Sequence, residues 1–135
     1  MTRCLLPIVL VLAVSTAHGA PAVVTRSTTN DIPSRPLVRL TVAPAGGTLC
    51  HAYQEFLPAT VEATNVTAGG IWLPDLHAIH WGPFTNSASV ELTYRLAGPQ
   101  GTYFPSGRLS ADGALAYTPI DIPVTVAAEI GRAHV

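Results

Sequence analysis

The feature that most constrains this chain is a strict alternation of apolar and polar residues in short segments. In residues 88–96 every second side chain is apolar and those between them are polar. Because successive side chains of a strand point to opposite faces of a sheet, this pattern predicts a half-buried strand. The same alternation in residues 37–42 and 120–126 predicts two more strands. Pro123 places the last of them at a sheet edge, because proline cannot donate to a ladder.

Weaker strand patterns lie between these three, at residues 49–56, 61–66, 78–81, 103–110 and 114–117. Turn-forming segments rich in Gly, Pro, Asn and Asp separate them. No segment after residue 19 keeps a helical period for three turns. The chain has 12 Pro and 11 Gly, and seven to eight short strands at regular spacing are typical of an all-β fold. We predict a single antiparallel, immunoglobulin-like β-sandwich, with a closed barrel as the alternative.

The two ends of the chain differ from this pattern. Arg3, an apolar run and small residues before a cleavage point after Gly19 predict a signal peptide at 1–19. Residues 20–35 mix Thr, Ser, Asn and Pro without an apolar period, so we expect a linker there and a sandwich at 36–128. The last seven residues, EIGRAHV, match the translation of a common sequencing adapter. We therefore expect 129–135 to be a non-native tail and the natural protein to be longer.

The amino-acid composition limits the kinds of partner that this protein can bind. Hydrophobic residues make up 48% of the chain and charged residues only 11%, which favours one folded domain over disorder. The net charge is -1, so there is no basic excess to neutralise phosphates and we expect no nucleic acid partner. After the signal no apolar run approaches roughly 20 residues, so we expect no membrane span in the mature protein. The prediction is a secreted, extracellular or cell-surface protein.

Asp75, His77 and His80 are the strongest candidates for a metal or catalytic site. In an extended strand, side chains three residues apart point to opposite faces, so the two histidines would not converge on one ion. The prolines and glycines around them leave too short a stretch for a helix that would bring both to one side. We therefore predict no metal ligands and no cofactor, with the three side chains lying on short strands and turns.

The remaining polar residues show no catalytic arrangement. Most of the carboxylates fall in turns or at positions that alternation assigns to solvent; the set is Asp31, Glu55, Glu62, Asp75, Glu91, Asp112 and Asp121. No nucleophile elbow, phosphate loop or zinc signature is present. Cys50 is expected to be a small buried side chain. We predict no catalytic residues and no enzymatic activity.

The aromatic residues are the best candidates for ligand contact. Trp81 shares a strand face with Ile79 and is expected in the core, where a large aromatic ring buries most apolar area. Trp72 lies beside a glycine pair and a turn, so it is the candidate for an exposed ring that packs on sugars or peptides. Tyr53 and Tyr103 are the candidates to join Trp72 on that face.

Three stretches carry a resemblance to a known kind of module: YQEFLP, GGIWLPDLHAIHWGPF and VELTYRLAGPQGTYFPSGRLSADG. Their Gly-Gly-x-Trp, Trp-Gly-Pro-Phe, Leu-Thr-Tyr and Ser-Gly-x-x-Ser-x-Asp-Gly patterns resemble immunoglobulin-like and cohesin-like β-sandwich repeats of large secreted bacterial proteins. The resemblance covers residues 37–126. It implies a fold more than an activity, and it implies neighbouring catalytic, adhesive or carbohydrate-binding domains in a longer chain.

Three functions follow from these observations as hypotheses. The first is a non-catalytic extracellular spacer or adhesion module, whose partners are neighbouring domains and an extracellular protein or glycan. The second is a carbohydrate-binding module that uses Trp72 with Tyr53 or Tyr103. The third is a small metal-dependent hydrolase that uses Asp75, His77 and His80.

Overall fold

The computed structural model describes residues 22–118 and 122–128. These residues form eleven β-strands and no helix, so the predicted all-β class is confirmed. No helix in this part of the chain is long and apolar enough to span a lipid bilayer. The predicted signal peptide at 1–19 and the predicted tail at 129–135 lie outside the described residues.

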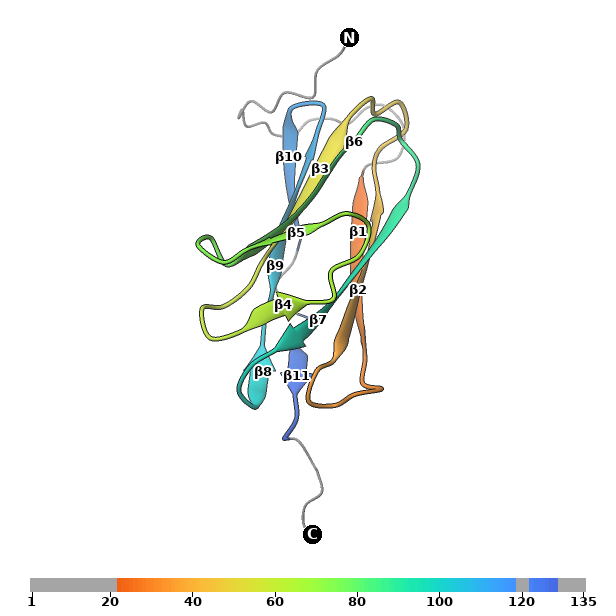
Figure 1. Ribbon diagram of the computed structural model, residues 1–135. Helices are drawn as coiled ribbons and strands as arrows, with labels where there is room; N and C mark the ends of the chain where they lie inside the picture. The colour runs from red at the N-terminus through yellow and green to blue at the C-terminus, as the bar shows by residue number, and fades with distance from the viewer. Residues whose placement is uncertain (1–21, 119–121, 129–135) are drawn as a thin grey trace.

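The strands form two large antiparallel sheets and one small one (Figure 1). The four-stranded sheet has the order β1 (Val23–Thr29), β2 (Leu37–Ala43), β7 (Val90–Ala97) and β4 (Glu62–Thr64). The five-stranded sheet has the order β10 (Ala114–Thr118), β9 (Ser106–Ala111), β3 (His51–Phe56), β6 (Ala78–Phe84) and β5 (Ile71–Leu73). The small sheet pairs β11 (Val124–Val126) with β8 (Gly101–Tyr103) near the C-terminal end of the molecule.

The inner faces of the two large sheets share one hydrophobic core. The alternating residues of β2 and β7 point into it as predicted, and Val38, Leu40, Leu92 and Tyr94 are all fully buried. The prediction that Trp81 lies in the core is also confirmed. The Trp81 ring lies 6.3 Å from the Tyr94 ring of the opposite sheet, so one aromatic pair joins the two layers. Each such side chain contributes about 1.5–3 kcal/mol by leaving water.

The predicted linker at 20–35 is wrong in part, because residues 23–29 form strand β1. β1 pairs with β2 along its whole length, from Val23 opposite Ala43 to Thr29 opposite Leu37. Threonine and valine are good strand formers, and the polar side chains of an edge strand are satisfied by solvent. Arg26 is the one buried polar side chain of this strand, and its partner lies in another part of the chain. The sequence of this segment alone therefore resembles that of a loop.

The strand count also exceeds the seven to eight that the sequence predicts. β4, β5, β8 and β11 have only three residues each, and β8 was not predicted as a strand separate from β9. A period of two cannot be recognised over three residues. The short strands β5 and β4 end the two large sheets on one side, and short edge strands limit pairing with other chains.

Candidate functional site

The structure separates the three residues considered for a metal site. Asp75 is exposed in the turn between β5 and β6, and His77 ends that turn with a φ of 50°. The His77 ring lies edge-on to Trp72, with 5.9 Å between ring centroids. His80 lies on β6, paired with Gln54 of β3. Across residues 22–118 and 122–128, no group of three His, Cys, Asp or Glu side chains is placed to hold a metal ion.

The three aromatic candidates do not form one exposed platform. Tyr53 is buried in the core, so the prediction of an exposed ring is wrong for this residue. It is buried because it alternates with Gln54 on a central strand and therefore faces the opposite sheet. Trp72 is half-buried at the end of the five-stranded sheet and packs against the core. Tyr103 is half-buried on β8, and its hydroxyl donates to the Pro99 carbonyl at 2.7 Å.

The largest polar cluster is a buried ion pair that joins the two sheets. Arg26 of β1 donates two hydrogen bonds to the Glu55 carboxylate of β3, at 2.8 and 2.6 Å. The hydroxyls of Tyr53 and Tyr94 each donate to the same carboxylate at 2.8 Å. Glu55 is fully buried, so it is an exception to the prediction that most carboxylates lie in turns or face solvent. The carboxylate is satisfied by four donors, as a buried charge requires.

The electrostatics of this cluster match a structural role. Burial by itself would lower the pKa of Arg26, but the hydrogen bond and the charge of Glu55 raise it above its ordinary value. Burial raises the pKa of Tyr53 and of Tyr94, and the negative charge of Glu55 raises both further. Arg26 therefore stays charged and the two tyrosines stay neutral near neutral pH. Because Glu55 is sealed from solvent, the cluster holds the sheets together and cannot reach a substrate.

Sequence reasoning missed this pair although a signal was present. Glu55 shares a face with His51 and Tyr53 in the segment HAYQEF, and that face is otherwise aromatic. A carboxylate at such a position implies a buried cation or hydrogen-bond donor as its partner.

His51 on the same face is fully buried and packs against Phe84, with 5.0 Å between ring centroids. Burial lowers the pKa of His51. Cys50 is also buried, as predicted.

A row of side chains runs across the outer face of the five-stranded sheet, one from each strand. Tyr117 of β10 pairs with Arg108 of β9, Arg108 with Gln54 of β3, Gln54 with His80 of β6, and His80 with Ile71 of β5. We call these five residues the cross-strand row. Their strand neighbours Tyr53, Leu109 and Ile79 point into the core, so the row points to solvent. Four strand spacings of about 4.8 Å make the row ~19 Å long.

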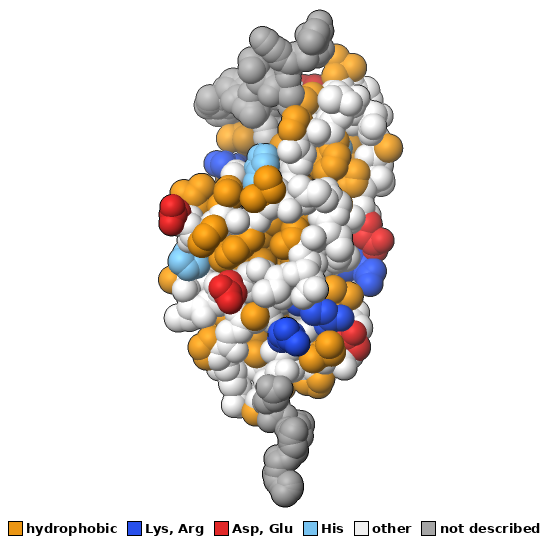
Figure 2. Space-filling model, in the orientation of Figure 1, with side chains coloured by type: hydrophobic (Ala, Val, Ile, Leu, Met, Phe, Trp, Pro, Cys, Tyr) orange, Lys and Arg blue, Asp and Glu red, His pale blue; other side chains and the backbone are white. Residues whose placement is uncertain are grey.

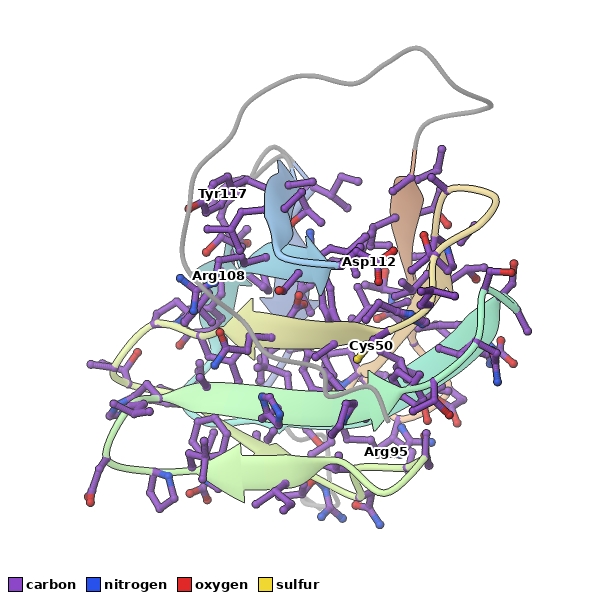
Figure 3. The ribbon with its side chains drawn as sticks, turned by 90° about the horizontal axis from the view of Figure 1, so that it is seen from above. Cys50, Arg95, Arg108, Asp112 and Tyr117 are labelled. Atoms are coloured by element: carbon purple, nitrogen blue, oxygen red, sulfur yellow. The ribbon has the colours of Figure 1, made fainter. Side chains whose placement is uncertain are left out.

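The two ends of the cross-strand row are its most exposed members. Tyr117 is 69% exposed and Ile71 is 57% exposed, whereas the three residues between them are half-buried. Figure 3 shows Tyr117 and Arg108 close together at the β10 end of the sheet. The row therefore offers an exposed aromatic ring next to a guanidinium, an amide and an imidazole in one line.

Arg108 is held in place by two neutral groups. Its guanidinium donates a hydrogen bond to the side-chain oxygen of Gln54 and lies over the ring of Phe56, 5.5 Å from the ring centroid. A cation above an aromatic face is attracted by the ring and loses rotamer freedom. These contacts orient Arg108 before any ligand arrives.

A small pocket of about 250 Å³ opens between the start of β1 and β10. Val24, Leu109 and Ala116 are among the apolar residues that line it, and Tyr117 and Thr118 are the lining residues whose side chains carry a hydroxyl group. Tyr117, a member of the cross-strand row, thus also borders this pocket. With so few hydrogen-bonding groups the pocket is a poor match for a polar ligand such as a sugar.

Comparison with known proteins identifies the fold and nothing more specific. No protein-family model matches the chain, and no curated protein matches it significantly. The chitin-binding domain of the hyperthermophilic chitinase from Pyrococcus furiosus matches in its solution structure with a TM-score of 0.54 and 14% identity over 76% of this chain and 98% of that domain. Its crystal structure matches with a TM-score of 0.56 and 13% identity, over 70% and 97% of the two chains.

A third solved structure, the ChBD2 domain from Thermococcus kodakarensis KOD1, has a TM-score of 0.53 and 13% identity, over 73% of this chain and 96% of that one. All three neighbours are covered almost completely, so the chain has the same β-sandwich architecture as these domains. At this level of identity the likeness establishes the fold and leaves the function to the chemistry of the surface.

Proposed function

We propose that this protein is a non-catalytic carbohydrate-binding module that binds a polysaccharide along the cross-strand row. The row is the observation that carries the proposal, because it combines an exposed aromatic ring with hydrogen-bonding groups on a regular sheet surface. The architecture shared with chitin-binding domains supports it. The signal peptide predicted at 1–19 supports a role outside the cell.

Each member of the row has chemistry that suits a sugar chain. The exposed ring of Tyr117 can pack against the apolar C–H face of a pyranose ring, and Ile71 offers an apolar contact at the other end. Gln54, Arg108 and His80 carry donors and acceptors for hydroxyl and acetamido groups. A row of ~19 Å is longer than one pyranose ring, so it suits a polymer better than a monosaccharide.

Binding, and not cleavage, is what this surface supports. Hydrolysis of a glycosidic bond uses two carboxyl groups on either side of the bond. None of the five residues of the row has a carboxyl group, and Glu55 is sealed in the core beneath them. The hydrolase hypothesis built on Asp75, His77 and His80 is the weaker one, because the structure does not gather these side chains around one point.

Co-sedimentation with insoluble chitin and cellulose tests the proposal. The purified protein is expected in the pellet, and Tyr117→Ala is expected to lower the affinity at least fivefold because the stacking ring is lost. Tyr117→Phe keeps the ring and is expected to bind within twofold of the original. Leu49→Ala, a substitution at an equally exposed residue away from the row, is the matched control.

Two outcomes would overturn the proposal. The first is no retention on any polysaccharide above background, which would favour the spacer or adhesion role. The second is equal retention of the original protein and Tyr117→Ala. Thermal unfolding of each variant confirms that it is folded before its binding is measured.

Trp72 and Tyr103 are secondary candidates for sugar contact, because both rings are partly exposed. Trp72 lies on β5, the strand that also carries Ile71 of the row. Trp72→Ala in the same assay tests its part, with thermal unfolding as the second readout because the ring also packs against the core. A loss of stability with unchanged affinity would assign Trp72 to packing.

A further inference from the structure

The outer face of the five-stranded sheet has an unbalanced charge. By alternation its outward residues are Ile71 and Leu73 of β5, Ala78 and His80 of β6, Ala52, Gln54 and Phe56 of β3, Ser106, Arg108 and Ser110 of β9, and Leu115 and Tyr117 of β10. This set contains one arginine, one histidine and no carboxylate. Among residues 22–118 and 122–128, no carboxylate side chain lies on this face beside Arg108, so a ligand there meets a cation that these residues do not neutralise.

Glu55 of β3 points into the core, where it is paired with Arg26, and two further acidic residues of the described chain lie in turns at the ends of the strands. Asp112 is in the turn between β9 and β10, and its carboxylate accepts hydrogen bonds from the backbone N–H groups of Leu49 and Cys50 at 2.9–3.1 Å. Figure 3 shows Asp112 near Cys50 and apart from Arg108 and Tyr117. Asp75 is in the turn between β5 and β6, at the far side of the sheet from β9. Within the described residues, neither forms a hydrogen bond or ion pair with Arg108.

Arg108 keeps most of its hydrogen-bonding capacity for a ligand. A guanidinium has five N–H donors, and the bond to Gln54 uses one of them. Neither an amide oxygen nor an aromatic ring cancels the positive charge. The planar guanidinium matches carboxylate and sulfate groups, which can accept two parallel hydrogen bonds from it. Because Gln54 and Phe56 already orient the group, little rotamer entropy is lost on binding.

We infer that the cross-strand row selects anionic polysaccharides over neutral ones, with a sugar ring on Tyr117 and the carboxylate or sulfate of the chain on Arg108. This inference rests on the proposed function and names the class of glycan that the same face prefers. It sets this chain apart from a module for neutral chitin, because a neutral sugar would leave the Arg108 charge without a counterpart.

Matched polymers test the inference. Affinity electrophoresis compares carboxymethyl cellulose with hydroxyethyl cellulose, and dextran sulfate with dextran, so that each pair shares a backbone and differs in charge. The anionic member of at least one pair is expected to bind tenfold or more tightly at low salt. The preference should shrink as salt is added, because exposed charges are screened. The cellulose pair reports on carboxylates and the dextran pair on sulfates.

Substitutions assign the preference to Arg108. Arg108→Gln is expected to bring the affinities for the anionic and neutral members within threefold of each other. Arg108→Lys keeps the charge without the planar fork and should retain part of the preference. Arg39→Gln is the matched control, since Arg39 is an arginine on the opposite face, paired with Glu91 at 2.9 Å. It should leave the preference unchanged.

The outcomes separate this inference from the proposed function. Equal binding of neutral and anionic polymers by the original protein would overturn the inference and leave the binding module intact. No binding of any polymer would overturn the proposed function. A preference that survives in Arg108→Gln, or disappears in Arg39→Gln, would overturn the assignment to Arg108.

Discussion

The arginines of the two large sheets have different kinds of binding partner. In the four-stranded sheet, Arg26, Arg39 and Arg95 each bind a carboxylate, from Glu55, Glu91 and Asp31 respectively. In the five-stranded sheet, Arg108 binds the neutral side chains of Gln54 and Phe56. Figure 2 shows acidic and basic side chains next to one another along one side of the molecule, as expected for a face of paired charges.

The arginines of the four-stranded sheet use their charge to stabilise the fold, whereas the charge of Arg108 is available to a ligand. A paired arginine is already neutralised, so a ligand would have to displace the carboxylate to use it. An arginine held by neutral groups is positioned but still charged. The outer face of the four-stranded sheet is otherwise rich in hydroxyls such as Thr41 and Thr93, which suits hydration. The face with the unneutralised cation is therefore the better candidate for recognition.

Removal of the buried cation is expected to have the largest effect. Arg26→Met leaves Glu55 charged and buried without its cation, which costs about 3–5 kcal/mol in the free energy of unfolding. Urea denaturation measures it. In the double variant Arg26→Met with Glu55→Gln the buried charge is gone, and part of the loss should be recovered. A loss under 1 kcal/mol in the single variant would contradict the role of the pair as the link between the sheets.

Removal of an exposed cation of the same sheet is expected to do much less. The side chains of Arg39 and Glu91 are 39% and 55% solvent-exposed, so water and salt screen their attraction. Arg39→Met should change the free energy of unfolding by less than about 1 kcal/mol in the same denaturation experiment. A loss comparable to that of Arg26→Met would show that exposure does not decide the strength of these pairs.

The smallest expected effect is a change in acid sensitivity. The hydrogen bond from Arg95, and then its charge, lower the pKa of Asp31 below the ordinary value of 3.8. A lowered carboxyl pKa stabilises the folded state above about pH 4, and this contribution is lost as the pH falls through the lowered value. Melting temperatures measured from neutral pH into strong acid should therefore fall slightly less in Asp31→Asn than in the original protein. Identical acid profiles would contradict the pairing.

Much of the fold can be predicted from local alternation. β2 and β7 follow their apolar pattern residue by residue, and Leu40 and Leu92, which face each other across the pair, are both fully buried. Trp81 could be assigned to the core because it shares a face with Ile79. These predictions succeed because the orientation of a side chain in a strand depends only on its parity. β1 was missed because few of its side chains point inward, and one of these is an arginine.

The candidate site could be predicted far less well. Alternation places Gln54, Arg108 and Tyr117 on outer faces, but it does not say that their strands are neighbours or in which register they pair. Gln54 and Arg108 are 54 positions apart in the sequence, and the pairing of β3 with β9 brings them side by side. The search for exposed aromatics by local context selected Tyr53, which is buried, and overlooked Tyr117, which is exposed.

By itself, the sequence determined which side chains of each strand face inward, that the class is all-β, and that the chain carries few charges. Only the tertiary structure decided which charges meet, namely that Arg26 reaches Glu55 across the sandwich and that Arg108 binds no acidic side chain among the described residues. The physical reason is that side-chain orientation is set by adjacent residues along one strand, whereas the pairing of charges is set by sheet order and register between strands distant in sequence.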